Sequence, residues 1–365
     1  MNLEYQRHIY FMRRAIELAE LGRGKTSPNP MVGCVIVKNG KIIGEGYHEE
    51  AGKPHAEINA LNTLTESPEG TIIYISLEPC IHYGKTPPCV PKIIEAKPSE
   101  VVIAMQDPNP LVSGKGISEL RNQGIKVTVG VLEHEAKKQN EVFIKYITTK
   151  MPFVIAKWAM SIDGKIATKS KNSKYLTSIE SLRLVHKIRN DVDSILIGGN
   201  TAIIDNPYLT PRLVEKTSNR TKIRVVLDKK SGLPENLNIF KFKEGAETWI
   251  ATPFSDRRYK SADRVIVIPP VEGKIPLGKL MEELGKENIT SVLIEGGGET
   301  FSSAFSEGLI DKVFVFIAPT IVGGKDAPTP IEGNGLAETV ADGINLRIEN
   351  IINSGRDIVI IGYPE

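Results

Sequence analysis

The stretch that decides the fold of the first half is PCIHYGKTPPC, residues 79–89, which has a cysteine near one end and another at the other. Upstream lies His55-Ala56-Glu57, at the start of an expected helix over residues 55–64. One imidazole and two thiolates supply three ligands to Zn²⁺ and leave the fourth tetrahedral position for water. The sequence therefore predicts a catalytic zinc site made by His55, Cys80 and Cys89.

Glu57 is the expected catalytic group beside this zinc. It lies two residues after His55, where it need not be a ligand and is placed to carry the proton of an acidified, zinc-bound water. His-x-Glu followed by Pro-Cys and a second cysteine is the signature of zinc deaminases, in which the glutamate is the acid and base. The common spacing there is Cys-x-x-Cys, and the spacing here is longer.

Two other interpretations of these residues stay open. A structural zinc site would need a fourth protein ligand, for which His48 or His82 is available. The segment could also hold no metal. The third cysteine, Cys34, lies in an expected buried strand over residues 32–37 and is interpreted as a small core residue.

Composition bounds the remaining possibilities. The chain has 365 residues, which favours two domains, and 46 basic against 44 acidic residues. This balance provides no bulk attraction for nucleic acid. The longest apolar run, residues 313–318, is too short to span a bilayer, and the N-terminus has no secretory pattern. With three cysteines and no disulfide framework, we expect a cytoplasmic protein.

Periodicity places alternating strands and helices in both halves, with a domain boundary between residues 147 and 148. The first domain, 1–147, has expected helices at 5–19, 55–64, 89–96, 116–123 and 133–146, and strands at 32–37, 41–47, 71–77, 101–105 and 126–131. The second, 148–365, has expected strands at 153–160, 194–197, 223–227, 248–251, 264–268, 291–294 and 312–317, helices at 178–190, 277–286 and 300–307, and a hairpin of 345–351 with 357–363.

Two strand-to-helix turns in the second domain are rich in glycine. They are Ile197–Thr201 and Ile294–Thr300. Glycines let the backbone approach a phosphate, and the following helix presents free N–H groups to it. Neither turn is a dinucleotide fingerprint or a P-loop, so each on its own is equally consistent with tight packing.

Several motifs together resemble one family. Residues 79–89, TSPNPMVGC at 26–34, GKPHAE at 52–57 and QDPNP at 106–110 are similar to the bacterial bifunctional riboflavin-biosynthesis deaminase/reductases. The resemblance extends over nearly the whole chain. It implies an α/β protein with an N-terminal cytidine-deaminase-like three-layer domain, followed by a dihydrofolate-reductase-like α/β domain.

The resemblance also implies a substrate and two cofactors. In such a family, zinc deamination of 2,5-diamino-6-(5-phosphoribosylamino)pyrimidin-4-one is followed by NADPH reduction of its ribosyl group to a ribityl phosphate. His55, Cys80 and Cys89 would bind zinc, and Glu57 would move protons. The positions that would hold the pyrimidine and its phosphate are Asn29, His48, His82, Lys85, Asp107 and Asn109.

For the second domain, the resemblance implies contacts to NADPH from Ala159, Tyr175, Thr201, Asp205, Lys229, Gly297, Gly298, Glu299, Thr300, Phe301, Ser302 and Ser303. The implied substrate positions are Ser173, Arg189, Leu209, Arg212 and Glu295, with the two arginines clamping the ribose phosphate. Lys157 and Asp163 are both candidates for proton transfer. Tyr175 stands where the family often has Trp, and Lys229 where it often has Ser, a place suited to the extra phosphate of NADPH.

The leading hypothesis is therefore a two-site enzyme that acts on a small phosphorylated pyrimidine, with no membrane or nucleic-acid partner. We expect a homo-oligomer, either a dimer or a tetramer. One alternative is a zinc deaminase acting on a nucleic-acid base, with a non-catalytic second domain. Others are a structural zinc protein with a partner-binding domain, and a chain in which only one domain is active.

Overall fold

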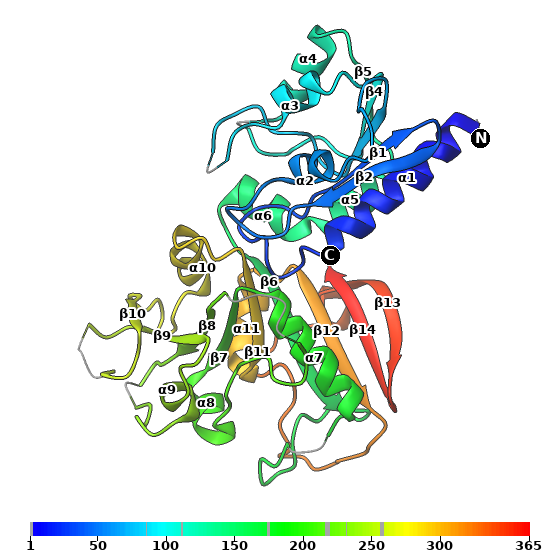
Figure 1. The fold of residues 1–365 in the computed structure, drawn as a ribbon. Helices are drawn as coiled ribbons and strands as arrows, with labels where there is room; N and C mark the ends of the chain where they lie inside the picture. The colour runs from blue at the N-terminus through cyan, green and yellow to red at the C-terminus, as the bar shows by residue number, and fades with distance from the viewer. Residues whose placement is uncertain are drawn as a thin grey trace. The chain divides into compact units, whose positions relative to one another are not determined.

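The computed structural model describes residues 3–84, 86–110, 112–173, 176–215, 220–230, 232–255 and 259–365. The chain divides into two compact units, Met1–Lys150 and Met151–Glu365, and each is built on its own sheet (Figure 1). Two expected site residues, Lys85 and Tyr175, lie outside the described residues.

The first unit contains a five-stranded sheet in the order β2-β1-β3-β4-β5. Strand β1 runs antiparallel to both of its neighbours, whereas β3, β4 and β5 are parallel. Asn39 and Gly40, both with positive φ, make the predicted hairpin turn between β1 and β2. The strands are β1 Gly33–Lys38, β2 Lys41–Tyr47, β3 Ile72–Ile75, β4 Glu100–Ile103 and β5 Lys126–Val129.

Helices cover both faces of this sheet, because neighbouring residues of the central strands point to opposite cores. Val35 and Val37 pack with one set of helices, and Cys34 and Ile36 with the other. The first set is α1 Leu3–Glu20, α5 Glu133–Gln139 and α6 Glu141–Thr149; the second is α2 Ala56–Asn62, α3 Val90–Glu95 and α4 Lys115–Asn122 (Figure 1). The predicted three-layer domain is confirmed, and Cys34 is a core residue as expected.

The single helix expected over residues 133–146 is wrong. Two helices, α5 and α6, meet at Asn140, whose backbone leaves the helical conformation. The Asn140 side chain accepts a hydrogen bond from the Met31 N–H (2.8 Å) and donates one to the Met31 carbonyl (2.9 Å). This contact crosses 109 positions of the sequence, so local periodicity could not reveal it.

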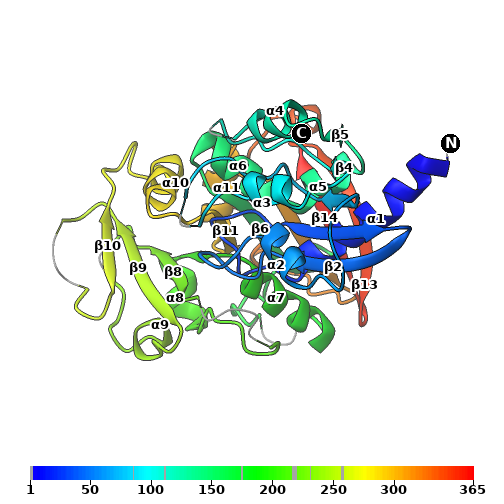
Figure 2. The same ribbon diagram turned by 45° about the horizontal axis from the view of Figure 1, so that its top comes forward.

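The second unit contains a nine-stranded sheet in the order β10-β9-β8-β7-β11-β6-β12-β14-β13. Its first seven strands are mutually parallel, and the C-terminal hairpin adds two antiparallel strands at one edge. Figure 2 shows β8, β9 and β10 running side by side at the other edge. The strands are β6 Phe153–Ser161, β7 Ser194–Gly198, β8 Lys222–Leu227, β9 Ala246–Thr252, β10 Arg264–Val267, β11 Ser291–Gly296, β12 Lys312–Ala318, β13 Leu346–Ser354 and β14 Asp357–Pro364.

Helices α10 and α11 pack against one face of this sheet through Leu280, Met281, Phe301 and Ala304, and α7 lies on the other (Figure 1). The expected α/β class of this unit is confirmed. The helices are α7 Ile179–Asp191, α8 Gly199–Asp205, α9 Asn238–Lys241, α10 Leu277–Lys286, α11 Gly298–Ser306 and the 3₁₀ turn Val340–Asp342. Among the described residues, no helix is both long and apolar enough to cross a membrane.

Candidate active sites

Three predicted zinc ligands converge in the first unit. His55 immediately precedes α2, Cys80 follows β3, and Cys89 immediately precedes α3. The His55 Nδ1 atom lies 3.4 Å from the Cys80 Sγ and 3.3 Å from the Cys89 Sγ. The base of the intervening loop is closed by hydrogen bonds from the N–H groups of Cys89 and Val90 to the Cys80 carbonyl.

The spacing of these donor atoms fits a tetrahedral zinc ion. Zinc–sulfur bonds of about 2.3 Å and zinc–nitrogen bonds of about 2.0 Å at tetrahedral angles place nitrogen and sulfur about 3.5 Å apart. The donors His55, Cys80 and Cys89 form a potential metal cluster within the described residues, and neither His48 nor His82 belongs to it. The set matches three protein ligands with one open position, as in catalytic zinc sites.

Thiol ionisation in this cluster is uneven. Hydrogen bonds from Cys89 and His55 lower the pKa of Cys80 to about 4, while the pKa of Cys89 is raised by the neighbouring Cys80 and by burial. A hydrogen bond to Cys80 raises the pKa of His55. A divalent cation would relieve this asymmetry, because it stabilises both thiolates and the neutral imidazole.

Glu57 lies on the first turn of α2, with a side chain that is almost fully buried beside the cluster. Burial raises the pKa of Glu57 to about 7, and the Cys80 thiolate adds to the increase. A carboxyl group with a pKa in this range can both accept and release a proton near neutral pH. The position predicted for the acid and base is therefore occupied by a group suited to that task.

His48 packs edge-on against the His55 ring, with ring centroids 5.3 Å apart. Its Nδ1 lies 3.1 Å from the Pro54 carbonyl and its Nε2 lies 3.1 Å from the Asn29 side-chain nitrogen. A carbonyl can only accept, so Nδ1 donates and Nε2 accepts from Asn29. Burial lowers the pKa of His48, consistent with this neutral ring. Both nitrogens are thus engaged, which argues against His48 as a fourth zinc ligand.

Asp107 and Asn109 lie on the loop after β4, and Glu78 organises that loop. The Glu78 carboxylate is buried and accepts hydrogen bonds from four backbone N–H groups, of Asp107, Gly114, Gly116 and Ile117, at 2.9–3.2 Å. Asp107 in turn accepts from the Asn109 N–H at 2.8 Å. Burial raises the pKa of Asp107 to about 6. Sequence reasoning missed Glu78, although a glutamate directly before the Pro-Cys pair was visible.

His82 stands apart from these buried groups. It lies in the exposed part of the loop between the two cysteines. His82 could therefore contact only a substrate that extends outward to the segment between Cys80 and Cys89.

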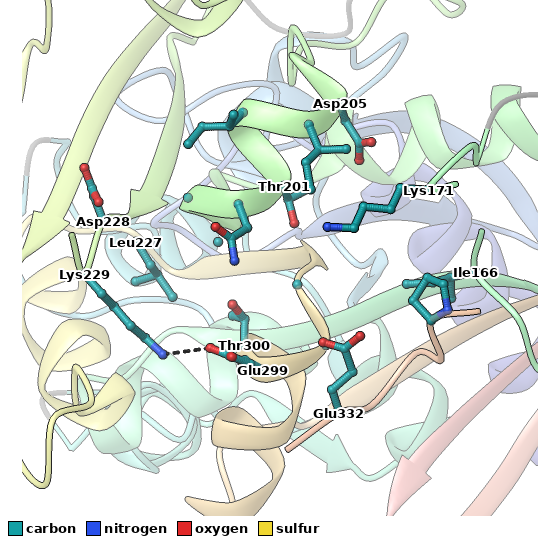
Figure 3. Close-up of a pocket in the computed structure, with 18 of the residues that line it drawn as sticks. Ile166, Lys171, Thr201, Asp205, Leu227, Asp228, Lys229, Glu299, Thr300 and Glu332 are labelled. Carbon is teal, nitrogen blue, oxygen red and sulfur yellow. Dashed lines mark hydrogen bonds and ion pairs between the residues drawn. The ribbon is translucent and has the colours of Figure 1, made fainter. Parts of the chain in front are cut away.

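A cavity of about 440 Å³ opens in the second unit, at the carboxyl ends of β7, β8 and β11 (Figure 3). This volume is within the range of small-molecule sites, and the position at parallel strand ends is typical of them. The expected cofactor residues that line it are Thr201, Asp205, Lys229, Gly297, Gly298, Glu299 and Thr300. Ser173, expected near substrate, also lines this cavity.

The glycine-rich turns at the cavity permit close backbone approaches. A Cβ atom on Gly199 would lie 2.9 Å from the Leu227 carbonyl oxygen, and one on Gly297 would lie 2.9 Å from the Thr300 Oγ1. Gly297 also has a φ of 88°, which favours glycine, and it immediately precedes α11. These features fit a phosphate-bearing ligand such as a nicotinamide dinucleotide, which the residues of both turns would hold.

Four expected cofactor residues do not line this cavity. Phe301 is buried against Trp158, with ring centroids 5.7 Å apart, and belongs to the core. Ser302 and Ser303 follow it on α11, and Ala159 lies on β6 paired with Phe316 of β12. The side chain of Phe301 thus serves packing, and the cofactor contacts expected of these four residues stay predictions.

A second group of expected residues forms a buried charge cluster. The Glu295 carboxylate binds Arg189 at two points, with Nε–Oε1 at 2.5 Å and Nη2–Oε2 at 2.7 Å. The Lys157 Nζ lies 3.9 Å from Glu295 Oε2. Burial alone would raise the pKa of Glu295, but Arg189 and Lys157 hold it below its usual value. Burial lowers the pKa of Lys157.

This pairing bears on the expected phosphate clamp, which stays a prediction. One edge of the Arg189 guanidinium is occupied by Glu295, so it cannot also bind a phosphate with that edge. Arg212 is different: it is exposed, with its guanidinium 4.4 Å from the Tyr208 ring centroid. The backbone N–H of Arg212 donates to His186 Nδ1 at 3.0 Å, and burial lowers the pKa of His186 to about 4. Leu209, on the same loop, is buried with a φ of 52°.

The structure separates the two candidates for proton transfer. Asp163 accepts hydrogen bonds from Ser161 Oγ, Val322 N and Gly323 N, and these lower its pKa to about 2. Such a carboxylate anchors the loop after β12 and is a poor proton carrier near neutral pH. Lys157 lies instead beside Glu295, which is one of the residues expected to contact substrate.

Together, these sites define a protein with a zinc-binding deaminase unit followed by a reductase unit. Residues 5–105 match the family model for the cytidine and deoxycytidylate deaminase zinc-binding region, and residues 152–360 match that for the RibD C-terminal domain. The chain belongs to the RibD family of riboflavin biosynthesis proteins.

Relatives cover nearly the whole chain. The RibD proteins of Aquifex aeolicus and Escherichia coli are 39% and 38% identical over 354 and 362 residues, spanning 96% of this chain in each case and 96% and 98% of theirs. The solved deaminase/reductase of Thermotoga maritima is 37% identical with a TM-score of 0.88, covering 99% of this chain and 100% of its own. Acinetobacter baumannii RibD is 35% identical, with a TM-score of 0.87 and coverages of 99% and 100%.

Proposed function

We propose that this chain catalyses two successive steps of riboflavin synthesis. The first unit would remove an amino group from 2,5-diamino-6-(5-phosphoribosylamino)pyrimidin-4-one by hydrolysis, and the second would reduce the ribosyl group of the product with NADPH. The observation that carries the proposal is a His55/Cys80/Cys89 cluster beside a buried Glu57, in one chain with a glycine-edged cavity. The Thermotoga maritima relative has a name that states both activities.

In the first unit, Glu57 would move the protons. Zinc, when bound by His55, Cys80 and Cys89, supplies the Lewis acid that activates water. Glu57 would take up the proton of that water and deliver it to the pyrimidine and the departing amine. A C2–O bond forms as the bond from C2 to the amino nitrogen breaks, so that water and the aminopyrimidinone become a pyrimidinedione and ammonia. Burial keeps the Glu57 carboxyl shielded from bulk water during this transfer.

The same unit would orient the substrate with several polar side chains. Asn29 and His48 hold each other through a hydrogen bond next to His55, and Glu78 holds the backbone that presents Asp107 and Asn109. His82 and Lys85 would reach the ribose phosphate from the loop between the cysteines. A preorganised set of this kind lowers the entropic cost of binding the substrate in the reactive orientation.

In the second unit, the chain would orient cofactor and substrate around the buried charges. NADPH, when bound in the cavity, supplies the hydride for C1 of the ribosyl group. The bond between C1 and the ring oxygen breaks, and Lys157 delivers a proton to that oxygen. Glu295 holds Lys157 and Arg189 in place, and the exposed Arg212 is the arginine available to the ribose phosphate.

Separate assays of the two half-reactions test this proposal. We expect Glu57→Gln to lose ammonia release by about 10²- to 10⁴-fold, while it still oxidises NADPH with substrate that is already deaminated. The matched control Glu95→Gln removes an exposed carboxylate of α3 and should change neither rate. Equal loss of both activities in Glu57→Gln would refute the assignment of two independent sites.

The proposal extends to the surroundings of the enzyme. We propose that it acts in the cytoplasm, as a homo-oligomer and without nucleic acid, since its cysteines are free and its net charge is only +2. Retention on a DNA or RNA column at low salt would contradict the last point. The sedimentation coefficient of the purified full chain measures the oligomeric state.

A further inference from the structure

Thr86 contacts the zinc ligand His55 on the side opposite the cysteines. Its Oγ1 lies 3.1 Å from His55 Nε2, whereas Nδ1 of the same ring faces the two sulfur atoms at 3.4 and 3.3 Å. The two ring nitrogens of His55 therefore have different neighbours. Thr86 belongs to the long segment between the cysteines and is not one of the residues expected to contact substrate.

The chemistry of metal binding fixes the direction of this hydrogen bond. An imidazole binds a metal through a nitrogen that carries no proton, and the geometry selects Nδ1 for that nitrogen. In the neutral ring, the proton then resides on Nε2, which can only donate. The Thr86 hydroxyl is thus the acceptor for His55 Nε2–H.

We propose that Thr86 is a positioning residue for zinc: it fixes the tautomer and ring orientation of His55. Hydrogen-bond acceptors on the outer nitrogen of ligating histidines are known to perform this task and to raise the basicity of the ligand. The inference rests on the proposed zinc site. The neighbouring His48 cannot serve as that acceptor in its place, because Asn29 and Pro54 engage both of its ring nitrogens.

The proposal also explains the length of the segment between the cysteines. A Cys-x-x-Cys spacing leaves two intervening residues, which is too short a chain to pass around the far side of the histidine. Here, the loop is closed at its base by the Cys89 N–H bond to the Cys80 carbonyl, and a Gly84 N–H bond to the Thr86 carbonyl turns it back. Pro87 and Pro88 then restrict the backbone between Thr86 and Cys89.

The test is the zinc affinity of full-length variants, measured by competition with a chromophoric chelator at fixed pH. Thr86→Val keeps the shape of the side chain and removes the hydroxyl, so we expect affinity to fall by about 10- to 100-fold. Thr86→Ser restores the hydroxyl and should stay within about 3-fold of the wild type. Tyr83→Phe is the matched control, because it removes a hydroxyl that is 82% exposed in the same loop.

Three outcomes would overturn the inference in different ways. Wild-type affinity in Thr86→Val would show that the hydroxyl does not hold His55. Equal losses in Thr86→Val and Thr86→Ser would assign the effect to loop shape instead of the hydrogen bond. Failure of the wild-type chain to bind one zinc would refute the proposed deaminase site itself, which the other two outcomes leave intact.

Discussion

The two candidate sites are assembled over very different distances along the chain. The zinc cluster joins His55, Cys80 and Cys89, which lie within 34 positions of one another. The charge cluster joins Arg189 on α7 to Glu295 on β11 across 106 positions. A site built from rare residue types at short spacing is visible in the sequence, whereas a site built from common charged residues depends on which of them the fold pairs.

The sites also differ in how their charges are balanced. In the first unit, a bound cation would balance the charge of the two sulfur ligands, and Glu57 titrates near neutral pH because it is buried. In the second, Glu295 is matched by Arg189 and Lys157 within the protein itself. Loss of Glu57 should therefore damage chemistry, whereas loss of Glu295 should damage folding.

The largest expected effect is on the charge cluster. Glu295→Gln leaves Arg189 and Lys157 buried without their counter-charge, so we expect the second unit to lose about 3–5 kcal/mol of unfolding free energy. Chemical denaturation of the full chain, followed by tryptophan fluorescence, measures it, because both tryptophans, Trp158 and Trp249, lie in that unit. The control Glu299→Gln changes an exposed carboxylate and should shift stability by no more than about 0.5 kcal/mol. If Glu295→Gln has the unfolding free energy of the wild type, the charge cluster does not stabilise the second unit, and the proposed difference between the two sites is wrong.

A smaller effect is expected at Glu78. Glu78→Gln replaces one carboxylate oxygen by an amide donor, so two of the four backbone N–H groups lose their acceptor. We expect a loss of about 2–3 kcal/mol in the first unit and a raised KM for the pyrimidine, with NADPH oxidation unchanged. Unchanged deamination kinetics would show that the Asp107 loop needs no such support. Glu119→Gln, on the exposed face of α4, is the control.

His186 should make the second unit sensitive to acid. Its pKa is about 4 in the fold against an ordinary value of 6.5, so the unfolded chain binds more protons between these values. Stability from this group is complete above pH 6.5 and falls as pH decreases towards 4, by at most about 1.4 kcal/mol per pH unit. The difference in unfolding free energy between wild type and His186→Gln, measured from pH 7 to 4, isolates this contribution. A difference that does not vary with pH would refute it.

The smallest expected effect concerns cofactor choice. Lys229 lines the cavity and forms an ion pair with Glu299 at 3.1 Å, where both side chains are partly exposed (Figure 3). We expect Lys229→Ser to weaken NADPH binding by about 5- to 10-fold and NADH binding hardly at all, because only NADPH carries the extra phosphate. Fluorescence titration with each cofactor measures this. Equal losses of affinity for NADPH and NADH would show that Lys229 does not recognise the extra phosphate.

Prediction from sequence succeeded where a local pattern carried the information. The strands of both sheets, the terminal hairpin and the three zinc donors follow from hydrophobic periodicity, turn residues and ligand spacing. It failed where a distant contact intervened. Asn140 breaks the expected helix through its hydrogen bonds to Met31. Prediction also missed the short helix α8, for a local reason: it begins at glycines, which have low helix propensity.

The sequence by itself determined the two α/β units, the family resemblance and the chemistry of the His55, Glu57, Cys80 and Cys89 set, since residue types at short spacing specify these. Only the tertiary structure decided that Glu295 pairs with the Arg189 guanidinium, that Asp163 anchors the loop after β12 and that Thr86 contacts the His55 ring. The physical reason is that charges and hydroxyls acquire their roles from their partners. Those partners are chosen by packing between segments that are far apart in the chain.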